Sequence, residues 1–144
     1  MNIKKFVSLF SLIIALSLVA PVCIAEIMIV TSKTNPLDKL KPSQCKRLWL
    51  GDKDVINGNK MLVIDQFTSS KLRHDFYRLV TKLSQKQLRS YRAKKIFSDG
   101  IFPPETRADD SKVIKWILQG DNRIGYIKST SYIAGLKVLL VIKE

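Results

Sequence analysis

The segment Val63–Phe76, VIDQFTSSKLRHDF, changes from an apolar run into a pattern typical of an amphipathic helix. The two halves are separated by a carboxylate, an amide and three hydroxyls, which belong to Asp65, Gln66, Thr68, Ser69 and Ser70. A strand that leads through a polar turn into a helix is typical of α/β sheets, which bind ligands beside such turns. The segment therefore predicts an α/β fold. It leaves two interpretations of the turn open: a helix cap alone, or a binding site for an anion.

The rest of the chain also alternates between strand and helix patterns. Short apolar runs predict strands at 26–31, 60–65, 124–127 and 138–142. Between them, apolar residues recur at helical spacing; Pro42 and Ser84 mark helix starts, and Gly51 and Gly120 mark helix ends. This alternation predicts a single α/β domain, built as a three-layer sandwich with a mostly parallel sheet.

Residues 1–25 have the pattern of a secretory signal peptide. Lys4 and Lys5 form a charged start, residues 6–20 are apolar, and Ala25 is a small residue before the expected cleavage point. The apolar run is too short and wrongly flanked for a spanning helix, and no other run in the sequence is long enough to cross a bilayer. We therefore expect a single domain at 26–144, in the periplasm or secreted. Lipid attachment at Cys23 is the alternative, which Val22 before it disfavours.

The chain is strongly basic. It carries 25 Lys and Arg residues against 12 Asp and Glu, a formal net charge of +13. The expected signal peptide holds two of the basic residues and none of the acidic ones, so 23 basic against 12 acidic residues leave +11 on the mature chain. Such a surface attracts phosphates, acidic proteins and anionic lipid headgroups. Export makes nucleic acid the least expected of the anionic partners.

The sequence offers little for catalysis or metal binding. Cys45 is the one cysteine after the expected cleavage point, so no internal disulfide can form, and its helical spacing with apolar neighbours favours a core position over a reactive thiol. His74 is the only histidine and is expected on the surface, so we expect no zinc site. Asp109 and Asp110 fit a helix cap better than a metal site. We therefore expect no enzyme activity, no metal and no cofactor.

Five stretches carry a resemblance to a known family: LKPSQCKRLWLG (40–51), KMLVIDQ (60–66), SSKLRHDFY (69–77), IFSDGIFPP (96–104) and NRIGYIKSTS (122–131). In this order and spacing, the chain resembles the phosphate-binding-protein-like domain of ABC transporters, and more narrowly its short exported members of about one domain. The resemblance implies one lobe of a type 2 periplasmic-binding-protein fold, and about half of the usual two-lobed ligand cleft. It implies a non-enzymatic protein with a phosphate-like oxyanion as ligand and an ABC permease as a partner.

This resemblance gives the turn before the helix a specific interpretation. The first amides of a helix lack intrahelical acceptors and carry the positive end of the helix dipole, so an oxyanion binds there readily. By position, Ser70 is similar to the family's hydroxyl at this helix start. The expected ligand-binding set combines this turn with the first βα loop: Thr31, Ser32, Asp65, Thr68, Ser69, Ser70 and Arg73. Asp65 would select an anion that retains a proton, and Lys71-Leu72 in place of a glycine-rich turn predicts weak binding.

A second hypothesis rests on the helix predicted after Ser84. Its polar face carries four basic residues: Lys86, Arg89, Arg92 and Lys94. They form either a solvated face or a docking surface for an acidic envelope protein or anionic lipid, where electrostatic steering would speed association. In the second case, the chain is a structural or adaptor subunit of an envelope complex with a degenerate ligand site. The sequence leaves the oligomeric state, the anion and the partner open.

Overall fold

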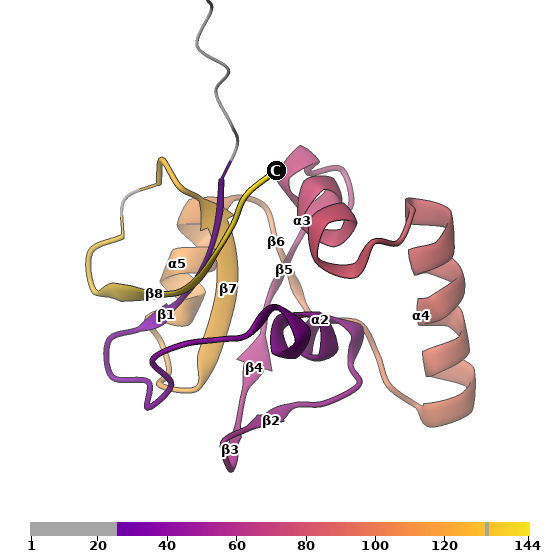
Figure 1. Ribbon diagram of the computed structural model, residues 1–144, viewed down its shortest axis with the longest axis horizontal. Helices are drawn as coiled ribbons and strands as arrows, with labels where there is room; N and C mark the ends of the chain where they lie inside the picture. Colours follow the sequence, from indigo (N-terminus) through magenta and orange to yellow (C-terminus); the bar gives the residue numbers. More distant parts are fainter. Residues whose placement is uncertain (1–25, 132) are drawn as a thin grey trace, which may run out of the picture.

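The structure is a computed structural model that describes residues 26–131 and 133–144 (Figure 1). The predicted signal peptide and Cys23 lie outside the described residues. The main sheet has four strands, in the order β4 (Leu62–Val63), β7 (Arg123–Lys128), β1 (Ile27–Ser32) and β8 (Leu136–Ile142). Two short pairs accompany it: the hairpin of β2 (Val55–Ile56) with β3 (Asn59–Lys60), and the parallel pair of β5 (Asp65–Gln66) with β6 (Thr106–Arg107).

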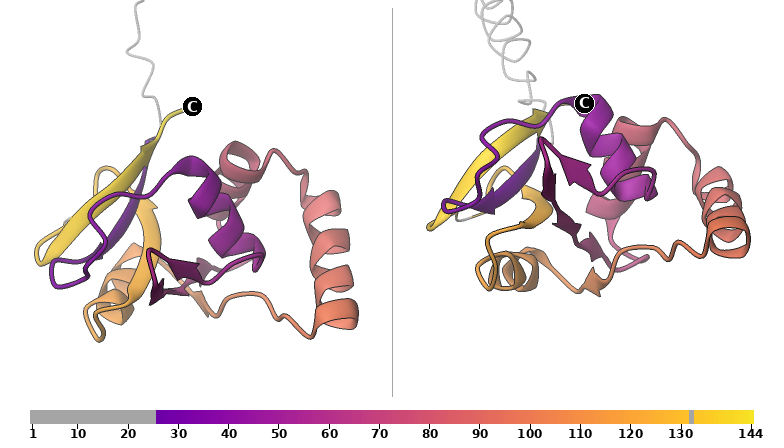
Figure 2. Two further views of the ribbon diagram at one scale, coloured as in Figure 1. Left: turned by 60° about the horizontal axis from the view of Figure 1, so that its bottom comes forward. Right: turned by 90° about the horizontal axis from the view of Figure 1, so that it is seen from below.

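Helices cover both faces of the main sheet, which gives the predicted three layers (Figures 1 and 2). Helices α2 (Pro42–Leu50) and α3 (Lys71–Thr81) share one core cluster with Ile27 and Ile29 of β1, whereas α5 (Asp110–Ile117) shares the other with Met28 and Val30. Both faces of β1 are therefore buried, which explains its continuous apolar run. Helix α4 (Gln85–Asp99) lies at the end of the molecule farthest from β1 and β8 (Figure 1).

The main sheet is mixed, so the expectation of a mostly parallel sheet is wrong. Within the described residues, β1 is antiparallel to both of its neighbours, β7 and β8, and β4 with β7 is the only parallel pair of this sheet. The alternation of strands and helices along a sequence indicates the class of fold, but it does not say which strands become neighbours. Here β7 and β8, from the C-terminal part of the chain, enclose the N-terminal strand and run opposite to it.

Most helix ends lie where local sequence signals predict them, although α5 ends at Ile117, three residues before the predicted stop at Gly120. Pro42 occupies the first turn of α2, Ser84 forms a capping box at the start of α4, and Asp109 caps α5. Gly51 ends α2 with a left-handed backbone (φ 76°), and a Cβ there would come within 2.8 Å of the Ile101 side chain. Both the backbone and the close contact require glycine at this position. None of the helices in the described part of the chain is long and apolar enough to cross a bilayer.

Cys45 lies fully buried in the core cluster of α2 and α3, which confirms its predicted core position. Burial raises the pKa of its thiol to about 12. Because the thiolate is the reactive form, we expect iodoacetamide at mildly alkaline pH to leave Cys45 of the chain 26–144 unmodified until denaturant is added. Intact-mass spectrometry measures the adduct. Rapid alkylation of the folded protein would contradict the buried position.

Arg92 departs from the prediction of an exposed basic face. It is only 8% exposed, and its Nη2 donates to the Trp49 carbonyl and, at 2.9 Å, to the Tyr77 hydroxyl. Arg92 lies four residues after the buried Leu88, so the two side chains share the inward face of α4. The remaining predicted members of the basic face are exposed: Lys86, Arg89 and Lys94.

Candidate functional site

Strand ends and helix starts meet at one edge of the molecule. β5 leads into α3 and β6 leads toward α5, and these two strands are parallel. β7 runs toward the same edge, because β4, which precedes β5, is parallel to β7. A hollow of about 720 Å³, here called the α3–α5 cleft, lies between these segments. Its wall consists of Gln66, Ser70, Lys71, Leu72, Asp75, Ala108, Asp109, Asp110, Ser111, Lys128, Thr130 and Ser131.

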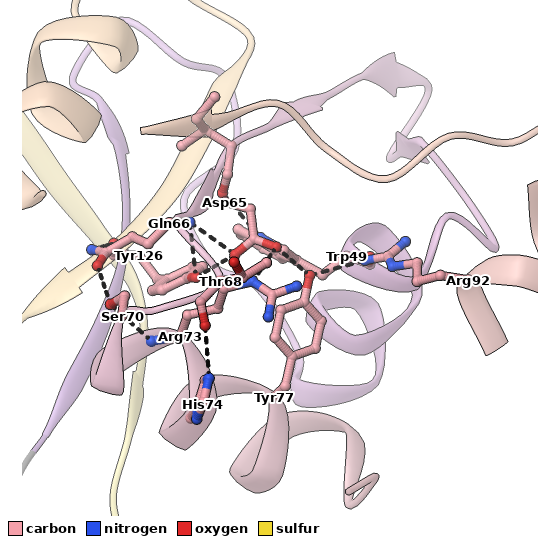
Figure 3. A network of polar contacts seen from close by, with 11 residues as sticks. Trp49, Asp65, Gln66, Thr68, Ser70, Arg73, His74, Tyr77, Arg92 and Tyr126 are labelled. Carbon is pink, nitrogen blue, oxygen red and sulfur yellow. Dashed lines mark hydrogen bonds and ion pairs between the residues drawn. The ribbon is translucent and has the colours of Figure 1, made fainter. Parts of the chain in front are cut away.

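Ser70 is the N-cap of α3, and its hydroxyl is engaged within the protein. It donates to Oε1 of Gln66 at 2.8 Å and accepts from the Arg73 amide at 3.3 Å (Figure 3). The amides of Lys71 and Leu72, which come first in α3, have no acceptor among the described residues, and both residues line the α3–α5 cleft. The helix start therefore offers two donors and the positive end of the helix dipole.

The turn residues before Ser70 are on the surface but do not line the cleft. Thr68 and Ser69 are both exposed. The Thr68 carbonyl lies 2.8 Å from Nε2 of His74, which is exposed as predicted, and this contact ties the turn to α3 (Figure 3). Of the three predicted hydroxyls, only that of Ser70 lies beside the cleft.

Thr31 and Ser32 lie at the opposite end of the strands from the start of α3, so the expectation that they join the helix start is wrong. Thr31 pairs with Ile124, near the beginning of β7, whereas the α3–α5 cleft lies at the end of that strand. The Thr31 hydroxyl is buried; it donates to the Arg123 carbonyl at 2.7 Å and accepts from the Asn35 side chain. The expectation depended on parallel strands, and β1 is antiparallel to β7.

Asp65 and Arg73 form a buried ion pair near the start of α3 (Figure 3). Nε of Arg73 lies 3.1 Å from Asp65 Oδ2, and the two side chains are 11% and 2% exposed. Asp65 also accepts from the Gln66 amide at 2.8 Å and from the hydroxyls of Tyr77, at 2.8 Å, and Tyr126. Contrary to expectation, neither Asp65 nor Arg73 lines the α3–α5 cleft, and their charges compensate each other inside the protein.

The two tyrosines act as permanent donors to this ion pair. Burial raises the pKa of Tyr77 and of Tyr126, and the negative charge of Asp65 raises both further. Both phenols are therefore protonated at neutral pH. The guanidinium of Arg73 also lies over the Tyr77 ring, 4.8 Å from its centre. This polar network joins α3 to β5 and β7.

Asp110 occupies the donor groups at the far side of the cleft. Its carboxylate accepts from Nε2 of Gln66 at 2.7 Å, from the Lys128 amide at 3.0 Å and from the Ser131 hydroxyl at 2.5 Å. Asp109 caps α5 by accepting from the Lys112 amide at 2.9 Å, as predicted. The start of α5 is therefore already supplied with negative charge from its own chain. Among the described residues, no group of three His, Cys, Asp or Glu side chains is placed to hold a metal ion.

The wall of the cleft is negative overall, although the chain is basic. It contains two lysines, Lys71 and Lys128, and three carboxylates, a formal charge of −1. The hydrogen bond from Lys71, 2.6 Å from Asp75, lowers the pKa of that carboxyl, and a hydrogen bond from Ser111 lowers the pKa of Asp109. Ionised carboxylates repel a fully ionised anion but accept a hydrogen bond from one that retains a proton.

Three cleft residues at the end of β7 and just after it were not predicted as site residues. Lys128, Thr130 and Ser131 belong to the stretch NRIGYIKSTS, one of those that carry the family resemblance. The sequence does contain a signal: the buried strand ends in the basic Lys128 and hydroxyls follow it, much as hydroxyls and a lysine follow β5. Their neighbours in the cleft lie far away in the sequence, so only the tertiary structure brings them together with Ser70.

Comparison with known proteins supports the fold. No family model matches the sequence, and no curated protein matches it. Among solved structures, an ABC-type phosphate transport receptor from Vibrio cholerae matches with a TM-score of 0.65 and 18% identity, over 81% of this chain and 46% of the receptor. A protein described as a phosphate ABC transporter substrate-binding protein, from Clostridium perfringens and with bound phosphate, matches with a TM-score of 0.61 and 16% identity, over 81% and 44% of the two chains. PstS from Borrelia burgdorferi matches with a TM-score of 0.56 and 12% identity, over 83% of this chain and 58% of the PstS chain.

The coverage defines the extent of the similarity. This chain spans less than half the length of the first two proteins, while four-fifths of it takes part in each match. Most of the chain therefore has the α/β fold of one lobe of the phosphate ABC transporter binding proteins.

Proposed function

We propose that this chain is an exported, non-enzymatic protein that binds a small, phosphate-like oxyanion weakly in the α3–α5 cleft. The observation that carries the proposal is the open start of α3, where Lys71 and Leu72 line the cleft and their amides have no acceptor among the described residues. Helix starts of this kind bind oxyanions through their amides and dipole. The similarity in fold to a binding protein that holds phosphate supports the same class of ligand.

The carboxylates of the cleft suggest which form of the anion binds. Asp75 and Asp109 repel negative charge, but each has oxygens that accept a hydrogen bond from a protonated oxyanion. Phosphate that retains a proton should therefore bind better than sulfate, which has none to donate. Affinity should be low, because a single lobe leaves much of the anion in water and small ligands need extensive burial for tight binding. A partner such as an ABC permease could supply a second wall.

Phosphate is expected to protect the protein against thermal unfolding more than sulfate does. A ligand at ten times its dissociation constant stabilises the folded state by about 1.4 kcal/mol, which is measurable as a rise in Tm. Thermal unfolding at increasing millimolar phosphate or sulfate tests this, with titration calorimetry as the direct measurement. If calorimetry detects no phosphate binding at millimolar concentrations, the proposed function is refuted.

Lys71→Pro, with Lys71→Gln as its control, tests the location. Proline is tolerated at the first helical position, and Ser70 already has the extended backbone (φ −69°, ψ 125°) that a residue before proline requires. Lys71→Pro removes an open N–H and a charge, whereas Lys71→Gln removes only the charge. We expect Lys71→Pro to abolish the phosphate effect and Lys71→Gln to weaken binding by about threefold or less. Undiminished protection of Lys71→Pro would exclude the α3 start.

A second candidate function is a structural or adaptor subunit of an envelope complex with a degenerate site. The specific observation in its favour is Asp110, whose carboxylate already takes three donors of the cleft. The exposed basic residues of α4 would then face an acidic partner: Lys86, Arg89 and Lys94. Capture of a partner from solubilised membranes, lost when all three become glutamine, would support it. Recovery of the protein alone from the soluble envelope fraction would count against it.

A further inference from the structure

A second hollow, of about 420 Å³, shares no residue with the α3–α5 cleft. It lies between the end of α2, the β2–β4 segment and the chain that follows α4. We call it the Arg92 hollow, because Arg92 of α4 forms part of its wall. Its volume is within the range of small-molecule sites, which are usually apolar cavities with a few polar groups.

Arg92 is a buried cation whose hydrogen bonds go only to neutral oxygens. It is 8% exposed, and Nη2 donates to the Trp49 carbonyl and the Tyr77 hydroxyl (Figure 3). Its Nε is buried and has no hydrogen-bond partner. No ion pair among the described residues includes Arg92. A buried charge without an anionic partner and a buried N–H without an acceptor both cost free energy. An anion bound beside Arg92 would offset the cost of the unpaired charge.

The carboxylates of the hollow do not provide that acceptor, because other cations already hold them. Asp52 pairs with Lys95 at 2.9 Å, and Asp54 pairs with Lys60 at 3.4 Å. Lys53 also lines the hollow and is exposed. With Lys53, Lys60 and the buried arginine, the wall has three cations against two carboxylates, a formal charge of +1. The hollow therefore favours an anion.

The rest of the wall is apolar and partly open to solvent. Phe102 is 73% exposed and Leu62 is 42% exposed, and Met61 and Ile101 continue the same surface. Exposed apolar side chains that gather at a hollow indicate a surface that a ligand covers. Phe97, which is 89% exposed, does not line the hollow and serves below as a comparison.

We propose that the Arg92 hollow binds a small organic carboxylate with an apolar body. The carboxylate accepts from Nη1 of Arg92, which has no hydrogen bond among the described residues and, unlike Nε, is not closed to solvent. It also lies within reach of the positive charge of Lys53. The apolar body covers Met61 and Phe102. This ligand differs from the anion proposed for the α3–α5 cleft, because it requires both a single carboxylate and an apolar part, and the two sites share no residue.

Benzoate is a suitable probe, and nuclear magnetic resonance of the purified protein is a suitable measurement. We expect benzoate to bind at millimolar concentrations and to shift the Arg92 Nε–H and Phe102 ring signals. Benzamide, which has the same shape without the charge, should shift neither, and inorganic phosphate should leave both signals unchanged. Phe102→Ser should weaken benzoate binding about tenfold, through lost apolar coverage, and Lys53→Gln about threefold.

The controls are matched in chemistry and differ in position. Phe97→Ser and Lys46→Gln make the same side-chain changes at exposed positions outside the hollow, and both should bind benzoate as the unchanged protein does. All four variants alter exposed residues, so the test does not depend on replacing Arg92. Equal binding of benzamide, or equal binding of acetate, would overturn the proposal. The proposal would also fail if benzoate left the Arg92 Nε–H signal unchanged while that signal exchanged magnetisation with a bound water. In that case a water, and not the carboxylate, would accompany the guanidinium.

Discussion

Asp65→Ala is expected to lower the free energy of unfolding by about 3–5 kcal/mol, because it leaves a buried cation without its partner. Arg73 would lose the carboxylate at 3.1 Å, with both side chains nearly inaccessible to water. The hydroxyls of Tyr77 and Tyr126 would lose their acceptor in the same substitution. Chemical denaturation followed by circular dichroism measures the change.

Asp38→Ala is the matched control, since it removes the same side chain from an exposed ion pair. Asp38 lies 2.8 Å from Lys137, with its side chain 86% exposed, and pairs of this kind add little to stability. We expect Asp38→Ala to unfold at nearly the same denaturant concentration as the unchanged protein. If Asp65→Ala did the same, the buried ion pair would not hold α3 against β5.

The ion pair also explains why two members of the predicted ligand set do not reach the cleft. A carboxylate at a strand end and an arginine in the next helix are typical ligand-binding groups, and the sequence alone does not say whether they face a ligand or each other. Asp65 in β5 and Arg73 in the first turn of α3 lie close enough for direct contact, and the phenols of Tyr77 and Tyr126 complete the hydrogen bonding of the carboxylate. The groups that remain for the proposed anion in the α3–α5 cleft are amides, hydroxyls and exposed lysines.

Helix ends could be predicted because they depend on a few neighbouring residues. Ser70 and Ser84 accept hydrogen bonds from amides three positions later, and Gly51 adopts the left-handed backbone that glycine allows. The core position of Cys45 follows from helical spacing for the same reason. These interactions form within one turn of chain, so their sequence patterns are local.

Strand neighbours could not be predicted, because pairing in this sheet joins distant parts of the chain. Ile27 pairs with Ile142 on one side of β1 and with Lys128 on the other. No local pattern specifies these partners or their antiparallel direction. For this reason Thr31 was wrongly expected beside the start of α3. The composition of the α3–α5 cleft was missed for the same reason.

The burial of Arg92 was not predicted, although the sequence contains a local pattern that indicates it. Leu88 and Arg92 are four residues apart and share a helix face. The predicted basic face includes both Arg92 and Lys94, but the helical spacing places Arg92 on the buried side of α4 and Lys94 on the exposed side. Reading the position of each charge relative to the apolar stripe would have identified Arg92 as a buried cation.

Phe76→Ala is the second substitution with a large expected effect. Phe76 is fully buried, its ring stacks on Tyr126 with centroids 4.0 Å apart, and it meets Trp49 edge-on at 5.0 Å. It therefore joins α3 to β7 and α2 at once. Removal of a buried phenylalanine costs about 3–5 kcal/mol, since the apolar contacts are lost and a cavity remains. Chemical denaturation measures the loss.

Phe97→Ala distinguishes this packing effect from a general loss of apolar surface. Phe97 is 89% exposed, so its removal should leave the denaturation midpoint almost unchanged. Phe76→Leu should fall between the two, because it retains part of the volume without the stacked ring. Since α3 also carries the open amides of Lys71 and Leu72, Phe76→Ala should weaken the phosphate effect through a displaced helix, even under conditions where the protein remains folded. A folded Phe76→Ala protein with unchanged phosphate protection would show that the ring does not position the start of α3.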